Sequence, residues 1–341
     1  MVVSIKDVAE RAGVSPGTVS NVFSGNRAVK THLIERVRRA AVELGYQPDR
    51  AASQLRAGKA KIVAAVVPDL NNPFFTSLIA SIEASVGGEG YDIIVASSHG
   101  DSEEEARRLS ALLGWRPAGL VIIPCNDDFS SRDLLAGSGV PFVVADRVPS
   151  HFTGNAVTVD NVDAGQKAAE HLIALGHRHF VVAASSLQLQ NIRERCEGIE
   201  AVLSREGLPI PTLIEVGLDF ETAEERLGTF MQGERQATAF IALTNFATLG
   251  ILASVNQTGL SVPKDISVLG FDDYSWMHAV NPPLTAIRQP VEEIGRRIWS
   301  RLRGHIDNED LPRTREKLSC ELVVRASTGV PDPVGGTQRQ A

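Results

Sequence analysis

The sequence predicts an all-α headpiece of the helix-turn-helix type, followed by an α/β core of two lobes, each built on a doubly wound parallel sheet. The first 60 residues carry three short amphipathic helical patterns separated by turn signals. From residue 61 on, apolar runs typical of buried parallel strands alternate with helical stretches, and the runs fall into two series. A chain of 341 residues is long enough for more than one hydrophobic core.

The first two helices are marked by their capping residues. Ser4 can cap the first helix, with an acid three residues later, and Gly13 can end it in a left-handed conformation. Ser15 can cap the second helix, with Pro16 at its first position. A third amphipathic helix is expected over 31–44.

The spacing around the first turn indicates a helix-turn-helix. Ala9 is small enough for the second helix to pack closely, Gly13 allows the sharp turn, and Val19 can fill the space between the helices. The alternative is a short helical hairpin of the kind found in enzymes, which can have a similar spacing. The second helix is expected to bury Val19, Val22 and Phe23.

The positive charge of the chain is concentrated at its N-terminal end. The whole chain has a formal net charge of -7. Residues 1–60 hold ten Lys and Arg against five Asp and Glu, a balance of +5, which leaves -12 for the remainder. This distribution is typical of phosphate binding confined to one end, although a solvated basic helix face has the same composition. Together with the turn spacing, it favours double-stranded DNA as a partner.

Nine apolar runs in the rest of the chain are expected to be strands. The first series lies at 62–67, 91–96, 119–123 and 141–145, and the second at 156–159, 179–184, 213–216, 238–243 and 266–270. Helical stretches lie between the runs. Two doubly wound sheets of this kind form two lobes, with a ligand crevice at the carboxyl ends of the strands.

Several protein classes do not fit the sequence. The N-terminus is charged by residue 6 and has no apolar signal-peptide segment, and no run approaches the roughly 18 apolar residues of a membrane span. Three widely spaced cysteines, Cys125, Cys196 and Cys320, form no metal-binding motif. We therefore expect a reduced, cytoplasmic protein with no membrane partner.

Motifs for catalysis and cofactors are missing as well. The sequence contains no G-x-S-x-G, P-loop, GxGxxG or zinc spacing. His177 and His179 lie at an expected helix-to-strand turn with no third ligand nearby. We expect no enzyme activity, no metal and no cofactor.

Longer motifs spread over residues 4–328 are the most specific feature of the chain. The N-terminal part contains SIKDVAERAGVSPGTVSNVFSG, ELGYQPDRAASQLRAGK and IVAAVVPDLNNPFF, and the rest contains VDNVDAGQKAAEHLIALGHRHF, VLGFDD, PPLTAIRQP and VVRAST. Together they resemble the lactose/galactose repressor (LacI/GalR) family of bacterial transcriptional regulators. The resemblance implies a homodimeric repressor that binds a palindromic DNA operator and is controlled by a small-molecule effector.

The resemblance also implies a division into three parts. Residues 1–47 would form the helix-turn-helix domain, 48–60 a hinge helix and linker, and 61–341 an effector-binding and dimerisation domain similar to periplasmic binding proteins. The chain would cross between the two lobes three times, including near 160 and 288, with the last crossing after PPLTAIRQP. The tail after VVRAST has no leucine heptad, so we expect a dimer without further assembly.

Residues for DNA binding follow from the second helix. Its face opposite Val19 and Val22 carries Pro16, Gly17, Ser20 and Asn21. The resemblance implies that Pro16, Gly17 and Asn21 point at base edges. An Asn at position 21 suits adenine, although contact with phosphate or water is the alternative. Hydroxyl side chains suited to phosphate contacts are those of Ser15, Thr18 and Ser24.

The hinge over 48–58 is too short to be a stable helix alone, so we expect it to fold with DNA and a partner chain. The resemblance implies that Leu55 inserts into the minor groove as a wedge; an ordinary linker contact is the alternative. Ala52 and Ser53 are small enough to approach the groove floor, and Arg50 and Arg56 can neutralise phosphates.

Candidate effector-binding residues lie mostly at expected strand ends or first helical turns. Asn191 and Arg195 stand four residues apart on one helix, so both can face the crevice. A strand-end residue can instead cap the next helix, which is the alternative for each acid. The candidates are Phe74, Phe75, Asp146, Arg147, Asp160, Asn191, Arg195, Phe220, Asn245 and Asp272.

The class of effector is left open by the sequence. A sugar or sugar derivative is the first expectation, and a purine-type or other non-sugar effector is the alternative. The pair Thr244-Asn245 replaces an Asn-Asp pair common in relatives, which with Arg147, Arg193 and Arg195 favours an anionic sugar derivative. A ligand-binding protein without DNA function is a more distant alternative.

Overall fold

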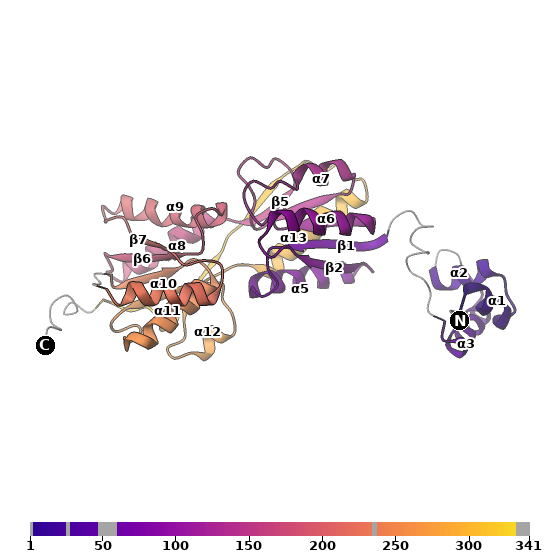
Figure 1. Cartoon of the computed structure of the whole chain (residues 1–341), viewed down its shortest axis with the longest axis horizontal. Helices are drawn as coiled ribbons and strands as arrows, with labels where there is room; N and C mark the ends of the chain where they lie inside the picture. The colour runs from indigo at the N-terminus through magenta and orange to yellow at the C-terminus, as the bar shows by residue number, and fades with distance from the viewer. Residues whose placement is uncertain (1–2, 25–27, 47–59, 234–236, 332–341) are drawn as a thin grey trace. The chain divides into compact units, whose positions relative to one another are not determined.

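The computed structural model describes residues 3–24, 28–46, 60–233 and 237–331. These residues divide into two compact units, a headpiece of three helices and a core that carries two sheets (Figure 1). Within the described ranges, no helix is long and apolar enough to cross a membrane.

The headpiece consists of α1 (Ile5–Ala12), α2 (Pro16–Ser24) and α3 (Thr31–Leu44). Its core forms where the three helices meet and contains Val8, Ala9, Ala12, Val19, Val37, Ala40 and Ala41. Gly13 ends α1 with a φ of 61°, a left-handed conformation that favours glycine. Ala9, Gly13 and Val19 therefore meet the steric demands of a helix-turn-helix, as the sequence predicted.

Capping residues fix the ends of the first two helices. The carboxylate of Asp7 accepts hydrogen bonds from the backbone N–H of Ser4 at 2.7 Å and from its hydroxyl at 2.8 Å. The Ser15 hydroxyl accepts from the Thr18 N–H at 3.1 Å. One prediction was wrong: Phe23 is 37% exposed, because its ring lies at the edge of the small core, 5.9 Å from the ring of Tyr46.

The core contains two six-stranded sheets with the same arrangement. The first has the order β11-β5-β4-β3-β1-β2, with β11 (Arg315–Leu318), β5 (Ala156–Val159), β4 (Phe142–Ala145), β3 (Pro117–Ile122), β1 (Ala60–Val67) and β2 (Asp92–Ser97). The second has the order β12-β10-β9-β8-β6-β7, with β12 (Glu321–Val323), β10 (Thr285–Arg288), β9 (Ser267–Phe271), β8 (Ala239–Ala242), β6 (Phe180–Ala184) and β7 (Thr212–Glu215).

All nine apolar runs contain strands of these sheets, which confirms the predicted two-lobed α/β core. Strands β10, β11 and β12 were not predicted. The second sheet is also not purely parallel, because β12 runs antiparallel to β10. β11 runs parallel to β5, so the two edge strands differ in direction.

Helices cover the sheets of both lobes (Figure 1). The first lobe carries α5 (Pro73–Gly87), α6 (Ser102–Gly114), α7 (Arg132–Ser138) and α13 (Val291–Ile306). The second carries α8 (Asn161–Ala174), α9 (Gln190–Arg205), α10 (Phe220–Met231), α11 (Asn245–Thr258) and α12 (Trp276–Ala279). α13 comes late in the sequence but packs on α5, β4 and β5 of the first lobe.

The chain crosses between the lobes at three places. It crosses after β5 near Asp160, after β10 near Gln289, and between β11 and β12 at Ser319. The sequence placed the last crossing after PPLTAIRQP, but the return of β12 to the second sheet adds one beyond it. Lys167 of α8 donates to the Ser319 hydroxyl and to the Cys320 carbonyl oxygen, each at 2.7 Å, and so holds the third crossing against the second lobe.

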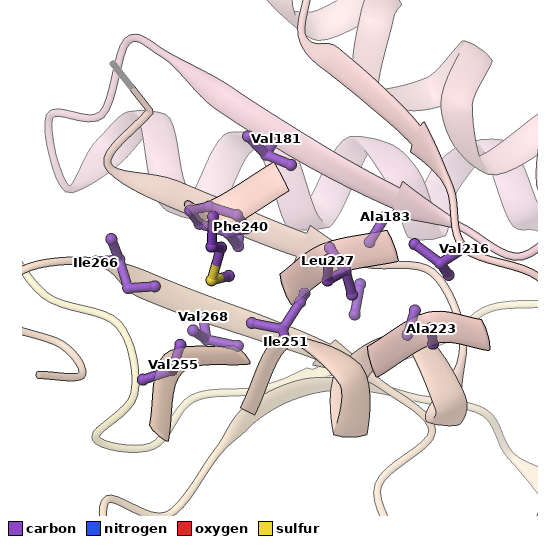
Figure 2. Close-up of a cluster of buried hydrophobic side chains, with 13 residues drawn as sticks. Val181, Ala183, Val216, Ala223, Leu227, Phe240, Ile251, Val255, Ile266 and Val268 are labelled. Atoms are coloured by element: carbon purple, nitrogen blue, oxygen red, sulfur yellow. The ribbon is translucent and has the colours of Figure 1, made fainter. Parts of the chain in front are cut away.

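The second lobe is stabilised by a buried apolar cluster between its sheet and helices α10 and α11 (Figure 2). Phe240 of β8 and Ile251 of α11 are fully buried there. Close packing of α10 on α11 requires Gly250, since a Cβ at this position would lie 2.9 Å from the Ala223 backbone. This rigid packing fixes the strand ends that carry the polar residues described below.

Candidate functional site

The exposed surface of α2 is the first candidate site. Ser15, Pro16 and Gly17 are exposed, while Ser20 and Asn21 are half-buried. Thr18 is also half-buried, and its hydroxyl lies 3.0 Å from that of Ser15. Ser24 is the last residue of α2. The hinge candidates Arg50, Ala52, Ser53, Leu55 and Arg56 lie outside the described residues.

The turn that presents α2 is held by Arg36 of α3. Its guanidinium donates to the carbonyl oxygen of Ala12 at 2.5 Å and lies against Gly13. A Cβ at Gly13 would stand 2.7 Å from the Arg36 Nη2 atom, which can move, so the positive φ is what requires glycine here. The arrangement orients α2 rigidly on the other two helices.

The second candidate site is the cleft between the lobes of the core. Asp146 follows β4 and Asp272 follows β9, and these strands occupy the same position in the two sheets. Both side chains are buried and both residues have a positive φ, 56° and 65°. A non-glycine residue in this conformation is strained, and such strain is concentrated at functional sites.

Two buried arginines lie in the same cleft. The guanidinium of Arg147 lies 5.3 Å from the centre of the Phe75 ring, and that of Arg195 lies 3.7 Å from the centre of the Phe271 ring. Arg195 exerts electrostatic effects on both Asp146 and Asp272, which places the three charges within Coulomb range of one another. The two carboxylates and the two guanidiniums balance one another in formal charge, and a third buried carboxylate, that of Glu194, lies 3.7 Å from the guanidinium of Arg315.

Burial shifts the titration of both carboxyls. It raises the pKa of Asp272 to about 6, and the positive charge of Arg195 and a hydrogen bond from Gln289 oppose the rise. Burial also raises the pKa of Asp146, opposed by Arg195 and Arg147. A carboxyl whose ionised form is disfavoured by burial is typical of a binding site rather than of a stabilising pair.

Several buried polar atoms of the cleft have no hydrogen-bond partner within the described protein. They are the Oδ1 atoms of Asn191 and Asn245, the Nε of Arg147 and the Oε1 of Gln289. Such atoms cost free energy unless a ligand or water satisfies them. Three of them are acceptors, so the cleft is arranged for a ligand with several hydrogen-bond donors.

Two cavities open beside these residues. One of about 240 Å3 is lined by residues of both lobes, among them Phe75, Arg147, Ser185 and Thr244. Another of about 730 Å3 is lined by Phe74, Asp272 and Gln289 as well as by residues of α5 and α12. The rings of Phe74 and Phe75 lie 5.5 Å apart but line different cavities.

Three sequence candidates have other surroundings. Asp160 caps α8, accepting a hydrogen bond from the Asp163 N–H at 3.1 Å. Phe220 begins α10 and is half-buried, but it does not line either described cavity; Leu218 and Asp219 line the smaller one. Arg193 pairs with Asp127 of the first lobe, so its charge is neutralised by that carboxylate.

Sequence reasoning missed three residues of the cleft. Gln289 donates to the Asp272 carboxylate at 2.6 Å, and it lies in the motif PPLTAIRQP. Asn161 accepts from the Nε of Arg195 at 2.9 Å, and Glu194 accepts from Asn161 at 3.2 Å. Their position beside Asp160 and Arg195 in the sequence was the available signal.

Comparisons with known proteins match two parts of the chain. Residues 4–49 match the lacI family of bacterial regulatory proteins, and residues 169–328 match a periplasmic binding protein-like domain. The HTH-type transcriptional repressor PurR of Haemophilus influenzae (strain PittEE) is 30% identical over 330 residues, which cover 95% of this chain and 98% of the relative. The chain belongs to the lacI family.

Other members of the lacI family show similar coverage. The ribose operon repressor of Escherichia coli (strain K12) is 29% identical over 327 residues, 95% of this chain and 99% of the relative. The lac repressor dimer bound to operator and the anti-inducer ONPF superposes with a TM-score of 0.86 at 27% identity, over 96% of this chain and 100% of that one. A lacI-family regulator from Enterococcus faecium with bound ribose has a TM-score of 0.71 at 25% identity, over 79% and 99%.

Membership in the lacI family makes the chain a transcriptional regulator and not an enzyme. The match over the full core also confirms the predicted combination of a helix-turn-helix headpiece with a periplasmic-binding-protein-like fold.

Proposed function

We propose that this lacI-family regulator binds a palindromic DNA operator as a homodimer and changes its operator affinity when a small neutral, polyhydroxylated effector binds between the lobes. The observation that carries the proposal is the cleft, where Asp146 and Asp272 balance the charges of Arg147 and Arg195, the buried carboxylate of Glu194 lies 3.7 Å from the Arg315 guanidinium, and neighbouring acceptors lack partners. The proposed location is the cytoplasm, because a bacterial regulator of this kind acts on chromosomal DNA.

DNA reading is assigned to α2 and the segment that follows the headpiece. Pro16, Gly17, Ser20 and Asn21 would face the bases, and Ser15, Thr18 and Ser24 the phosphates. Arg50, Ala52, Ser53, Leu55 and Arg56 would act in the minor groove and on the flanking backbone. The proposed domains are the helix-turn-helix domain over 1–47, the hinge and linker over 48–60, and the effector-binding domain over 61–341. The lac repressor dimer bound to operator supports the dimeric state.

The effector class follows from charge and hydrogen bonding. Carboxylates and amide oxygens accept from hydroxyl groups, and guanidiniums donate to them, so a sugar can satisfy both kinds of group. Because Arg193 pairs with Asp127, the excess positive charge that favoured an anionic effector is absent from the centre of the cleft. The ribose operon repressor and the ribose-bound regulator among the relatives support a carbohydrate.

Size supports a small effector. The cavity at Arg147 has a volume of about 240 Å3. Pockets for drug-sized ligands start at roughly 300 Å3, so the cavity at Arg147 suits a monosaccharide, whereas the cavity of about 730 Å3 at Asp272 is large enough for a bigger molecule.

Calorimetric titration of the full chain tests the effector class. The probes are D-ribose and D-galactose as neutral sugars, D-gluconate as a sugar acid, and hypoxanthine as a purine. We expect a neutral sugar to bind most tightly. Exclusive binding of hypoxanthine would mean that the effector is a purine, and exclusive binding of D-gluconate would mean that it is a sugar acid.

Selection from random DNA tests the other half of the proposal. We expect an inverted repeat whose half-sites lie about one helical turn apart, as a two-fold dimer requires. Recovery of a single asymmetric site would contradict the dimer, and failure to enrich any sequence would favour a ligand-binding protein without DNA function.

A further inference from the structure

Arg195 is held on three sides inside the cleft. Its Nε donates to Asn161 Oδ1 at 2.9 Å, its Nη1 donates to the Leu243 carbonyl oxygen at 2.6 Å, and its guanidinium stacks on the Phe271 ring. The residue is 3% exposed. No hydrogen bond of the described residues uses Nη2, although Arg195 lines neither of the two described cavities.

Asn161 can hold Arg195 only with one orientation of its amide. Its Nδ2 donates to Glu194 Oε2 at 3.2 Å and to the Val159 carbonyl oxygen at 3.4 Å. Both partners are acceptors, so the amide must present its Oδ1 to the guanidinium. At 1% exposure, the side chain has no water to compete for these hydrogen bonds.

Glu194 connects this contact to the other lobe. It is buried, and its Oε1 lies 3.7 Å from the guanidinium of Arg315 on β11, in the first sheet. Arg315 in turn donates to the Val148 carbonyl oxygen at 3.1 Å. A continuous chain of polar contacts therefore runs from the first lobe through Glu194 and Asn161 to Arg195 of the second lobe.

Close packing of α8 on α9 brings Asn161 and Arg195 together. A Cβ at Gly165 of α8 would overlap the carbonyl oxygen of Arg195, and a Cβ at Gly198 of α9 would overlap that of Val162. The two glycines let the helix backbones touch. The first residue of α8 therefore lies within side-chain reach of the first turns of α9.

We propose that Asn161 is a positioning residue for effector binding. It fixes the Arg195 guanidinium with its free edge toward the cleft, and Glu194 and Arg315 make that orientation depend on the arrangement of the lobes. A guanidinium held in its bound conformation loses less conformational freedom when the effector arrives. This inference rests on the proposed function, in which Arg195 contacts the effector.

The test uses the full chain with Asn161→Ala, and Asn161→Ser as a second variant in case the first fails to fold. Neither side chain reaches the Nε of Arg195. The matched control is Asn155→Ala, which removes a half-buried amide that lies 2.8 Å from the His305 Nε2. D-ribose and D-galactose affinities are measured by calorimetry, and the same variants are made on an Arg195→Ala background.

We expect the Asn161 variants to bind the tighter of the two sugars at least tenfold more weakly, and the control to stay within twofold of the wild type. On the Arg195→Ala background, loss of Asn161 should have no more than a twofold further effect, because the positioned group is already gone. Unchanged affinity in the Asn161 variants, or equal losses on both backgrounds, would overturn the proposal.

A second readout needs no effector. Solvent exchange at the Arg195 Nε–H is measured by nuclear magnetic resonance, with the signal identified by its loss in Arg195→Lys. Exchange should be at least tenfold faster in the Asn161 variants than in the wild type and the control. If neither sugar binds the wild type, the neutral-sugar effector is refuted. The exchange rate alone then tests the role of Asn161, and an unchanged rate in the Asn161 variants rejects it as the positioning residue.

Discussion

Asp146 and Asp272 occupy equivalent positions in the two lobes. Each follows the third strand from the β11 or β12 edge, and each donates its backbone N–H to the neighbouring strand, Asp146 to Val157 at 3.0 Å and Asp272 to Ile287 at 2.9 Å. Both have a positive φ. The repeated topology thus brings one strained carboxylate from each lobe to the same cleft, at a cost of about 1–3 kcal/mol for each strained residue.

Asp272→Asn should stabilise the effector-free protein at neutral pH. Burial raises the Asp272 pKa to about 6 from an ordinary 3.8, so the folded state binds the proton more tightly and loses stability as pH rises from about 4 to 7. An amide at this position avoids the buried charge, and the free energy of unfolding at pH 7.5 should rise on the order of 1–3 kcal/mol. Denaturant unfolding at several pH values measures this.

The same experiment contains its own control. The stability difference between Asp272→Asn and the wild type should shrink as pH falls toward 5, because the wild-type carboxyl then takes up its proton. A difference that is constant with pH, or a variant less stable at pH 7.5, contradicts the desolvation account. Sugar binding should be lost in the variant at every pH.

Gly165→Ala should destabilise the second lobe, because the added methyl group overlaps the Arg195 carbonyl oxygen. Overpacking against backbone costs roughly 1–3 kcal/mol. The matched control is Gly137→Ala in α7, where nothing lies within 4 Å of the added atom. Thermal unfolding should show a lower midpoint for Gly165→Ala and an unchanged or higher one for the control; equal midpoints would mean that α8 and α9 can move apart freely.

His177 should make the core sensitive to mild acid. It is buried, it contacts Thr238, Ser267 and Gly329, and burial lowers its pKa from 6.5. Its folded pKa is depressed, so the unfolded state binds more protons below pH 6.5 and stability falls as pH drops through this range.

His177→Gln should therefore lose stability at pH 7.5 but change less between pH 7.5 and 5.5 than the wild type does. His151→Gln, at an exposed position, is the control and should follow the wild-type curve. If His177→Gln keeps the wild-type pH dependence, another group is responsible for the acid sensitivity.

Gly17→Ala should stabilise the headpiece by about 1 kcal/mol, because glycine is a poor helix former and the new Cβ meets only the Ser15 hydroxyl at 3.6 Å. If Gly17 lies against base edges as proposed, the added methyl group should also change the operator selected from random DNA. An unchanged operator together with the higher stability would remove Gly17 from the DNA interface.

The sequence predicted elements with strong apolar or capping signals and missed those without them. The nine predicted strands lie in apolar runs, although β7 (TLIE) is mostly exposed, whereas β11 (REKL) and β12 (ELV) are short edge strands with partly exposed residues. β10 (TAIR) was missed although it is buried, because only two apolar residues, Ala286 and Ile287, stand together in it. Phe23 was assigned to the core from its helical period alone, but its ring lies against Tyr46 and is 37% exposed.

In the cleft, too, some residues could be predicted from the sequence and others could not. Asp146 and Asp272 could be predicted because polar residues that end apolar strands meet at one edge of a sheet. Asn161, Glu194 and Gln289 could not, because their roles depend on which helix packs against which and on where the chain crosses between the lobes. Asp160 has the strand-end signal, yet its side chain caps α8.

The coupling between the two sites is the central claim, and linkage gives its most direct test. The tightest-binding neutral sugar of the titration, with D-ribose as the first probe, is titrated against free protein and against protein saturated with the selected operator. Operator affinity is measured with and without saturating sugar. The account predicts that both affinities change by the same factor, and that Arg195→Ala keeps operator binding but loses the response. Equal sugar affinity for free and operator-bound protein would contradict it.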